Sequence, residues 1–261
     1  MRIIIPTVCL CLIACSAFAE RQVSYEDYNR IHRIARKQYD RLIHQRRAWK
    51  TLGRSVDGRK ILYGEIGSGK KTTLVIGGLH GDEPAGVLVA MRLARAVRAN
   101  PSLLKNRLLI VPCLNPDGLA RKTRTNARGV DINRNFPTRT WSSEFGKDHN
   151  NSGLFPASEP ETVLISNLIE LKRPDMIIQI HQPFNTLYPE EGFPSLLMER
   201  MSLISDLPVS NDVGYRTPGS LASIRETLGF HTDMVTLELC PIDEEPHYGK
   251  VIMAILEAVN D

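Results

Sequence analysis

The segment Thr73–Arg98 reads TLVIGGLHGDEPAGVLVAMRLARAVR, and this pattern decides the fold class. Residues 73–77 are mostly apolar and β-branched, which is typical of a strand buried on both faces of a sheet. A short glycine-containing loop follows, and Pro84 then stands at the first turn of a helix expected over Pro84–Arg98. A strand that leads through a short loop into a helix indicates an α/β protein.

Strands and helices alternate along the rest of the chain as well. The 261 residues have an ordinary globular composition without internal repeats, and they suffice for one domain with a sizeable core. Ser158 and Glu161 form a capping-box pattern at the start of one expected helix. The other expected strands are Ile61–Ile66, Arg107–Val111, Met176–Ile180 and Met234–Leu239, and the other expected helices are Ser158–Leu171 and Pro246–Val259.

The N-terminus carries the pattern of an export signal. Residues 1–19 begin with a positive charge, continue with an apolar run and end with the A-x-A cleavage pattern of Ala17 and Ala19. The run is too short to span a bilayer, which favours a cleaved signal peptide over a membrane helix. Alternatively, residues 12–15 (LIAC) form a lipoprotein processing box and Cys15 carries a lipid anchor. Both interpretations place the mature protein outside the cytoplasm, and we expect it in the periplasm.

Positive charge is concentrated after this signal. Residues 20–60 contain 12 Lys or Arg and 5 Asp or Glu, although the whole chain has a net charge of only +4. Within a basic helical segment at residues 20–52 we expect an amphipathic helix, whose apolar stripe is Tyr28, Ile31, Ala35, Tyr39 and Leu42. The segment is either a solvated face of the domain or a surface held near anionic lipid or cell-wall polymer. Without interleaved aromatic residues, nucleic acid is not expected as a partner.

Two cysteines, Cys113 and Cys240, lie outside the signal, each at the end of an expected strand. An oxidising compartment would permit a disulfide between them. We expect two buried thiols instead.

Polar side chains follow several of the expected strands, at the sheet edge where α/β proteins bind ligands. His80 and Glu83 follow the strand at residues 73–77, and His181 follows the strand Met176–Ile180. Catalytic zinc sites commonly use three protein ligands of the His₂Glu kind and keep a fourth position open for water. We therefore predict that His80, Glu83 and His181 bind one Zn²⁺.

Two further polar features complete this constellation. Glu238 lies within the otherwise apolar strand Met234–Leu239, and a buried carboxylate is costly unless it is paired or functional. We expect Glu238 to be a general base that takes a proton from zinc-bound water and delivers it to the leaving amine. In the polar segment at residues 129–137 (GVDINRNFP), Asn133 and Arg134 offer charge-assisted donors suited to a substrate carboxylate.

In their order along the chain, these motifs resemble those of the zinc carboxypeptidase family. The resemblance runs from Gly53 to the last helix, and it implies one catalytic domain at residues 53–261. Its fold would be a mixed, mostly parallel sheet flanked by helices. The matching motifs are H-x-x-E at residues 80–83, N-P-D-G at 115–118, R-K-T-R at 121–124, G-V-D-x-N-R-N at 129–135, S-E-P-E-T at 158–162, His181 and Glu238.

The resemblance also implies roles for individual residues. Arg124 would stabilise the oxyanion of the tetrahedral intermediate, and Asn133 with Arg134 would hold the substrate's terminal carboxylate. Asp131 would orient the first zinc histidine. Tyr215 lies near the position of the family's mobile active-site tyrosine.

Within the family, the chain is most similar to members that act on bacterial cell-wall peptides, the murein peptide amidases and the periplasmic D,L-carboxypeptidases. The local likenesses include residues 80–83 (HGDE) and 213–220 (VGYRTPGS). They imply hydrolysis of the γ-D-glutamyl–meso-diaminopimelate bond in tripeptide stems of peptidoglycan. The expected lining of the diaminopimelate pocket is Asp82, Tyr215, Arg216, Thr217 and Ser220.

Three other functions are open at this point. One is a generic metallocarboxypeptidase that removes C-terminal amino acids from ordinary peptides. A second is an N-acyl amino acid deacylase with an H-G-x-E zinc motif, against which the segment around Asn133 and Arg134 argues. The third is a wall-binding module without activity, which would be expected to lack a ligand or the base. Neither is missing here, which favours an enzyme.

Overall fold

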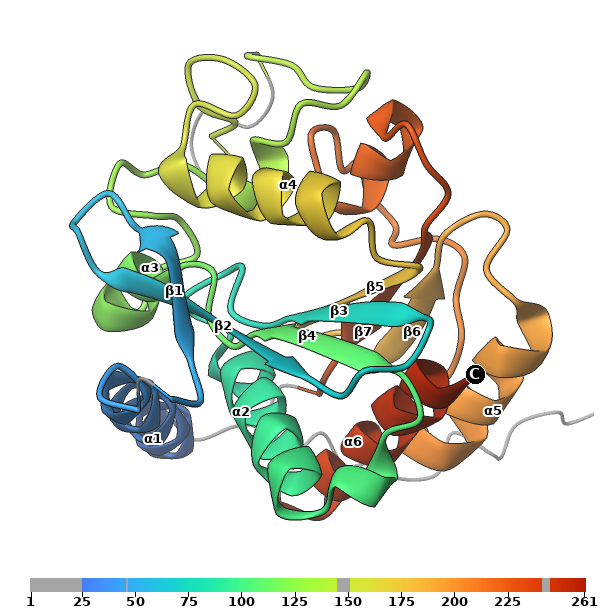
Figure 1. Ribbon diagram of the computed structural model, residues 1–261. Coiled ribbons are helices and arrows are strands. Elements are labelled where there is room, and N and C mark those ends of the chain that lie inside the picture. Colours follow the sequence, from blue (N-terminus) through green and yellow to red (C-terminus); the bar gives the residue numbers. More distant parts are fainter. Residues whose placement is uncertain (1–24, 46, 145–150, 241–244) are drawn as a thin grey trace, which may run out of the picture.

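The structure is a computed structural model that describes residues 25–45, 47–144, 151–240 and 245–261. The predicted signal at residues 1–19, including Cys15, lies outside these ranges. Within them the chain forms a seven-stranded sheet in the order β1-β2-β4-β3-β5-β7-β6 (Figure 1). The strands are β1 (Lys50–Arg54), β2 (Lys60–Ile66), β3 (Thr72–Ile76), β4 (Arg107–Val111), β5 (Met176–His181), β6 (Thr186–Pro189) and β7 (Asp233–Glu238).

The centre of the sheet is parallel and its margins are antiparallel. Strands β4, β3, β5 and β7 run side by side in the same direction, whereas β2 and β6 pair antiparallel to β4 and β7. The expected mixed α/β sheet is therefore confirmed. Because the central strands are parallel, their carboxyl ends meet at one edge, and His181 pairs there with Glu238.

Helices cover both faces of the sheet. In Figure 1, α4 lies over one face, and α2, α6 and α5 lie over the other. Side chains alternate between these layers: Leu74 and Ile76 of β3 join the cluster under α4, whereas Val75 joins the larger cluster under α2 and α6. The helices are α1 (Tyr25–Leu42), α2 (Pro84–Ala99), α3 (Pro116–Arg121), α4 (Pro160–Lys172), α5 (Ser195–Ser205) and α6 (Glu245–Asn260), with short 3₁₀ turns η1 (Pro101–Leu103), η2 (Ile132–Arg134) and η3 (Ala222–Thr227).

The basic N-terminal segment forms helix α1, which packs against the same domain. Ala35 and Tyr39 of its apolar stripe are buried in the larger core cluster. The hydroxyl of Tyr39 donates a hydrogen bond of 2.9 Å to the carbonyl of Lys60, which fastens α1 to β2. The boundary expected after residue 52 falls inside β1, so this segment is continuous with the sheet. In the described part of the chain, no helix is long and apolar enough to cross a membrane.

Two local expectations differ from the structure. Helix α4 begins at Pro160, and the hydroxyl of Ser158 donates to the Glu159 carboxylate instead of capping the helix. The capping-box prediction is wrong because Glu161 does not turn back to Ser158: its carboxylate accepts a hydrogen bond from the amide of Val56. Cys113 is buried as expected, but Cys240 is partly exposed, and the two cysteines form no disulfide.

The start of helix α2 approaches the end of strand β5 more closely than a side chain would permit. A Cβ atom at Gly86 would lie 2.8 Å from the carbonyl oxygen of Ile180. Only glycine allows this approach without a shift of helix or strand. The contact matters because Glu83 immediately precedes α2 and His181 ends β5.

Replacement of Gly86 by alanine should therefore destabilise the protein. We expect Gly86→Ala to lower the free energy of unfolding by about 1–3 kcal/mol, the usual effect of overpacking a core. The matched control is Gly249→Ala, also in a helix, where an added Cβ meets nothing within 4 Å. That change should stabilise the helix by up to ~1 kcal/mol. Urea denaturation of both variants measures the difference, and equal stabilities would contradict the packing argument.

Candidate active site

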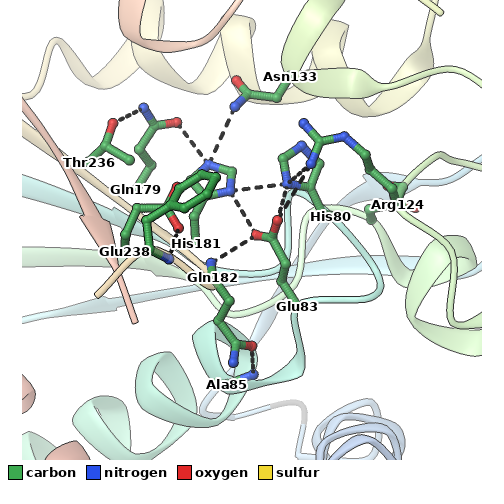
Figure 2. Close-up of polar contacts among 12 residues, drawn as sticks. His80, Glu83, Ala85, Arg124, Asn133, Gln179, His181, Gln182, Thr236 and Glu238 are labelled. Atoms are coloured by element: carbon green, nitrogen blue, oxygen red, sulfur yellow. Dashed lines mark hydrogen bonds and ion pairs between the residues drawn. The ribbon is translucent and has the colours of Figure 1, made fainter. Parts of the chain in front are cut away.

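Three buried side chains converge at the carboxyl edge of the sheet (Figure 2). His80 lies in the loop after β3, Glu83 precedes α2, and His181 is the last residue of β5. The Glu83 carboxylate lies between the two rings, 2.6 Å from Nδ1 of His80 and 2.8 Å from Nδ1 of His181. The two Nδ1 atoms are 3.2 Å apart, so three potential ligand atoms face one small volume.

The chemistry of this donor set fits a zinc ion. Two imidazole nitrogens and one carboxylate are the protein ligands of a common class of catalytic zinc site. The other nitrogen of each ring has a polar partner: Nε2 of His80 lies 3.2 Å from Asp131, and Nε2 of His181 lies 3.4 Å from the Gln179 side-chain oxygen. Such outer partners fix the ring orientation in metal sites and leave Nδ1 to face the metal.

Burial and mutual charge set the electrostatics of the cluster. Burial disfavours the charged ring of His80, but the carboxylates of Glu83 and Asp131 outweigh it and raise the pKa of His80 to about 9. Burial likewise disfavours ionised Glu83, yet the two imidazoles hold the pKa of this carboxyl below its ordinary value. Burial lowers the pKa of His181 and so favours its neutral ring. The Glu83 carboxylate therefore lies between one ring that favours its charged form and one that favours its neutral form, and a divalent cation would also stabilise this carboxylate.

Neighbouring segments hold the loop at residues 80–83 in place. The backbone amide of Gln182, directly after β5, donates to the Glu83 carboxylate at 3.3 Å, and its side-chain oxygen accepts a 2.9 Å bond from the amide of Ala85. From the other side, helix α1 contacts the loop backbone. The hydroxyl of Tyr28 donates to the Asp82 carbonyl at 3.0 Å, and Nε2 of His32 lies 3.1 Å from the Gly81 carbonyl.

Glu238 lies beside the cluster on β7. The residue is 7% exposed, and its carboxylate accepts a long hydrogen bond, 3.5 Å, from the amide of Phe184. Burial, with the nearby charge of Glu83, raises the pKa of Glu238 to about 8. A carboxylate with this proton affinity can accept and return a proton near neutral pH, as a general base must.

Arg124 and Asp131 form an ion pair next to His80. The Arg124 Nε atom donates to the fully buried Asp131 carboxylate at 2.8 Å, and its Nη1 atom lies 3.3 Å from Nδ1 of His80. The other Asp131 oxygen faces the His80 ring and the amide of Asn133. Asp131 therefore holds an imidazole and a guanidinium in fixed positions at once.

Arg134 is buried without a carboxylate partner. Its side chain is 2% exposed, and Nη1 donates to the carbonyl of Asn133 at 2.8 Å. Its Nε atom has no hydrogen-bond partner, and within the described ranges the guanidinium forms no ion pair with a carboxylate. Burial lowers the pKa of Arg134, which the more distant charge of Asp131 and the Tyr215 side chain partly offset. Tyr215 lies over the guanidinium, with 6.0 Å between Cζ and the ring centroid. A buried cation with unused donors is suited to an anionic group of a ligand.

One cavity of about 560 Å³ is lined by His80, Glu83, Arg124, Asn133, Arg134, His181 and Glu238, whereas Asp131 lies behind its wall. Four of the five residues expected in the substrate pocket also line it: Asp82, Tyr215, Thr217 and Ser220. Arg216 is exposed and does not line the cavity, unlike its neighbours Tyr215 and Thr217.

Sequence reasoning missed several lining residues. Gln179 is buried in β5, contacts Nε2 of His181, and donates to the Thr236 hydroxyl at 2.6 Å. The alternation of strand side chains offered a signal, because Gln179 lies two residues before His181 and must share its face. The other missed lining residues include Tyr28, Phe184, Tyr188, Glu190 and Thr236.

Comparison with known proteins decides the family. Residues 37–190, more than half of the chain, match the model of the zinc carboxypeptidase family. The chain belongs to the zinc carboxypeptidase family. As a member it is a metal-dependent hydrolase whose cofactor is Zn²⁺, and the cluster of His80, Glu83 and His181 offers the site that such an ion requires.

The relatives that match most of this chain include two murein peptide amidases. The chain is 32% identical over 215 residues to murein peptide amidase A of Escherichia coli K12, covering 78% of this chain and 86% of that protein. It is 32% identical over 210 residues to murein peptide amidase A of Vibrio campbellii, covering 75% and 80%. The crystal structure of a murein-tripeptide amidase from Escherichia coli O157 superposes with a TM-score of 0.69 at 30% identity, covering 82% of this chain and 92% of that one.

The position of Asp131 leads to a test of its role in metal binding. Asp131→Asn keeps the shape of the side chain but removes the charge that faces His80 and Arg124. We expect the affinity for zinc to fall by about 10–100-fold, as is usual when the outer partner of a metal-bound histidine is lost. Competition with a chromophoric chelator measures the zinc dissociation constant. The control is Glu159→Gln, a buried acid that bonds Asn126, and an equal loss in both variants would contradict a specific role for Asp131.

Proposed function

We propose that this zinc carboxypeptidase cleaves the γ-D-glutamyl–meso-diaminopimelate bond in tripeptide stems of peptidoglycan. The printed names of its relatives, murein peptide amidase A and a murein-tripeptide amidase, support this substrate class. The observation that carries the choice of a terminal residue is Arg134, a buried guanidinium in the cavity with unused donors. A free carboxylate at the end of the substrate would pair with it.

Recognition begins at this guanidinium. Arg134 binds the free carboxylate of the terminal residue, and the side chain of Asn133 borders the same cavity beside His181. Tyr215, partly exposed at the cavity wall, covers the bound carboxylate from the solvent side. These contacts place the preceding amide bond near the cluster of His80, Glu83 and His181. Binding of the carboxylate thus orients the amide bond for attack.

The residues around the cluster then perform the proton and charge chemistry. Bound zinc supplies Lewis acidity, which lowers the pKa of a water molecule and polarises a carbonyl group. Glu238 accepts the proton of the attacking water and passes it to the leaving amine, consistent with its pKa of about 8. Arg124, held through Nε by Asp131, directs its Nη1 atom towards His80 and Glu83, where it would stabilise the oxyanion.

Export is part of the proposal. The pattern at residues 1–19 supports secretion to the periplasm, with or without lipidation of Cys15. An enzyme there would meet peptidoglycan stems directly. The basic helix α1, with its charged residues on the exposed side, is compatible with a location near anionic envelope polymers.

The role of Glu238 can be separated from metal binding. Glu238→Gln keeps the shape of the side chain and removes its ability to accept a proton. We expect kcat to fall by at least ~10²-fold while the zinc content stays near that of the wild type. Steady-state kinetics and elemental analysis of the same preparation measure both quantities. Loss of zinc in this variant would make Glu238 a ligand and refute its assignment as the base.

Stem length tests the substrate. In a tripeptide stem the carboxylate at the L-centre of diaminopimelate is free, whereas in tetra- and pentapeptide stems it is locked in an amide. Placing an amide beside the buried Arg134 leaves the charge unpaired, so we expect kcat/KM to be at least ~100-fold higher for the tripeptide. Mass spectrometry of products from matched synthetic stems measures these rates.

The variant Arg134→Ala provides the control for this comparison. Without the guanidinium, the variant should cleave the tripeptide with a raised KM and lose most of its preference over the tetrapeptide. Equal wild-type rates on all stem lengths, or a preference for ordinary C-terminal L-amino acids, would overturn the proposed substrate. The second result would support a generic metallocarboxypeptidase.

A further inference from the structure

The floor of the cavity is a polar stripe on one face of the sheet. Pairing places Thr186 opposite Glu238 and Tyr188 opposite Thr236, and the amide of Glu190 donates to the carbonyl of Met234 at 2.9 Å. Since side chains alternate along strands, the residues of this stripe share one face. The lining members are Gln179, His181, Tyr188, Glu190, Thr236 and Glu238.

This stripe is unusual because the adjoining layer is apolar. Ile177 of β5 and Met234 of β7 lie on the same face and pack in the core cluster beneath α4. Toward the carboxyl edge, the buried side chain of Gln179 and the hydroxyl of Thr236 replace such residues and bond to each other. A floor of this kind suits a substrate side chain that carries polar groups. An apolar side chain would displace water from the polar atoms of the floor without replacing its hydrogen bonds, which is costly.

Glu190 lies at the far end of this floor. It is level with Met234, four residues from Glu238 along β7, or about 13 Å at the usual rise per residue of a strand. A terminal residue whose preceding amide bond lies beside Glu238 would therefore reach Glu190 only with a long side chain. The charged end of that side chain would then meet a carboxylate.

The carboxylate of Glu190 is not neutralised by the protein. It is partly buried, and in the described ranges no Lys, Arg or His nitrogen lies within 4 Å of it. Arg225 is near, but its guanidinium donates to the carbonyl of Glu191 and lies 4.0 Å from the Glu191 carboxylate. Burial raises the pKa of Glu190, an effect that Arg225 partly offsets.

The surroundings of Glu190 add to its negative potential. A second cavity shares Tyr188, Glu190, Val213 and Thr217 with the first, so the two cavities adjoin at Glu190. Its other lining includes the carboxylates of Glu199 and Asp212, whereas the side chain of Glu191 is 99% exposed and screened by solvent. A cation at the far end of the floor would be favoured by the charges of Glu190, Glu199 and Asp212.

We propose that Glu190 binds an ammonium group at the end of the terminal residue's side chain and so determines specificity for that residue. The inference rests on the proposed function and deepens it. Diaminopimelate carries a second amino group, beside its second carboxylate, at the far end of a long side chain. Lysine presents a similar ammonium group, and norleucine has the same chain without it.

The test uses peptides that differ in linkage and in terminal side chain. γ-D-Glutamyl and ordinary α-linked peptides would each end in diaminopimelate, lysine or norleucine. For the wild-type enzyme we expect kcat/KM to be about 10–100-fold higher with an ammonium-bearing terminal residue than with norleucine, as for a hydrogen-bonded charge. Glu190→Gln should lose this preference through a raised KM, with norleucine peptides cleaved at the wild-type rate.

Glu191→Gln is the matched control, because the neighbouring Glu191 side chain is 99% exposed and bears the same charge. It should leave the preference unchanged, and zinc content and melting temperature confirm that each variant is folded. Equal wild-type rates with lysine and norleucine, or an equal loss on both in Glu190→Gln, would overturn the assignment. If the enzyme cleaved only α-linked peptides, the proposed function would be refuted. The role of Glu190 would still hold if the preference for an ammonium-bearing terminal residue over norleucine were lost in Glu190→Gln.

Discussion

A buried carboxylate between two imidazoles, that of Glu83 between His80 and His181, is the interaction on which the rest of the structure depends. It joins the loop after β3, the start of α2 and the end of β5 at one point. Such burial is costly unless every charge has a partner. The close packing at Gly86 and the bonds from Gln182 supply the geometry that makes it possible. The parallel strands β3 and β5 also contribute, because their carboxyl ends lie at the same edge of the sheet and so bring these residues together.

The charges of the cavity fall into two groups. Where the metal would be held, they balance within the protein: Asp131 pairs with Arg124 and faces His80, and Glu83 faces both rings. Elsewhere they do not. Arg134 and Glu190 are each without an ion-pair partner in the described ranges, one a cation and the other an anion. A ligand with a carboxylate and a distant ammonium group would pair with both, and the proposed substrate has these two groups.

The sequence predicted the part of the site that is local in the chain. His80, Glu83, His181 and Glu238 were recognisable because polar residues at the ends of apolar strands are conspicuous, and the structure brings them together. The fold class followed from the same strands. What the sequence did not indicate depends on contacts distant in sequence: β6 is a short strand ending in Pro189, and it is defined only by its pairing with β7. Glu190 could therefore not be placed, and Arg216, expected in the pocket, is exposed and does not line the cavity.

The central claim is that His80, Glu83 and His181 hold one zinc ion in reach of Glu238. The most direct measurement is anomalous X-ray scattering from a crystal of the purified protein, recorded on both sides of the zinc absorption edge. The account predicts one anomalous peak about 2.0–2.2 Å from Nδ1 of His80, Nδ1 of His181 and a Glu83 carboxylate oxygen. A zinc peak coordinated by other residues, or a zinc-supplemented, active crystal without a peak at this cluster, would contradict it.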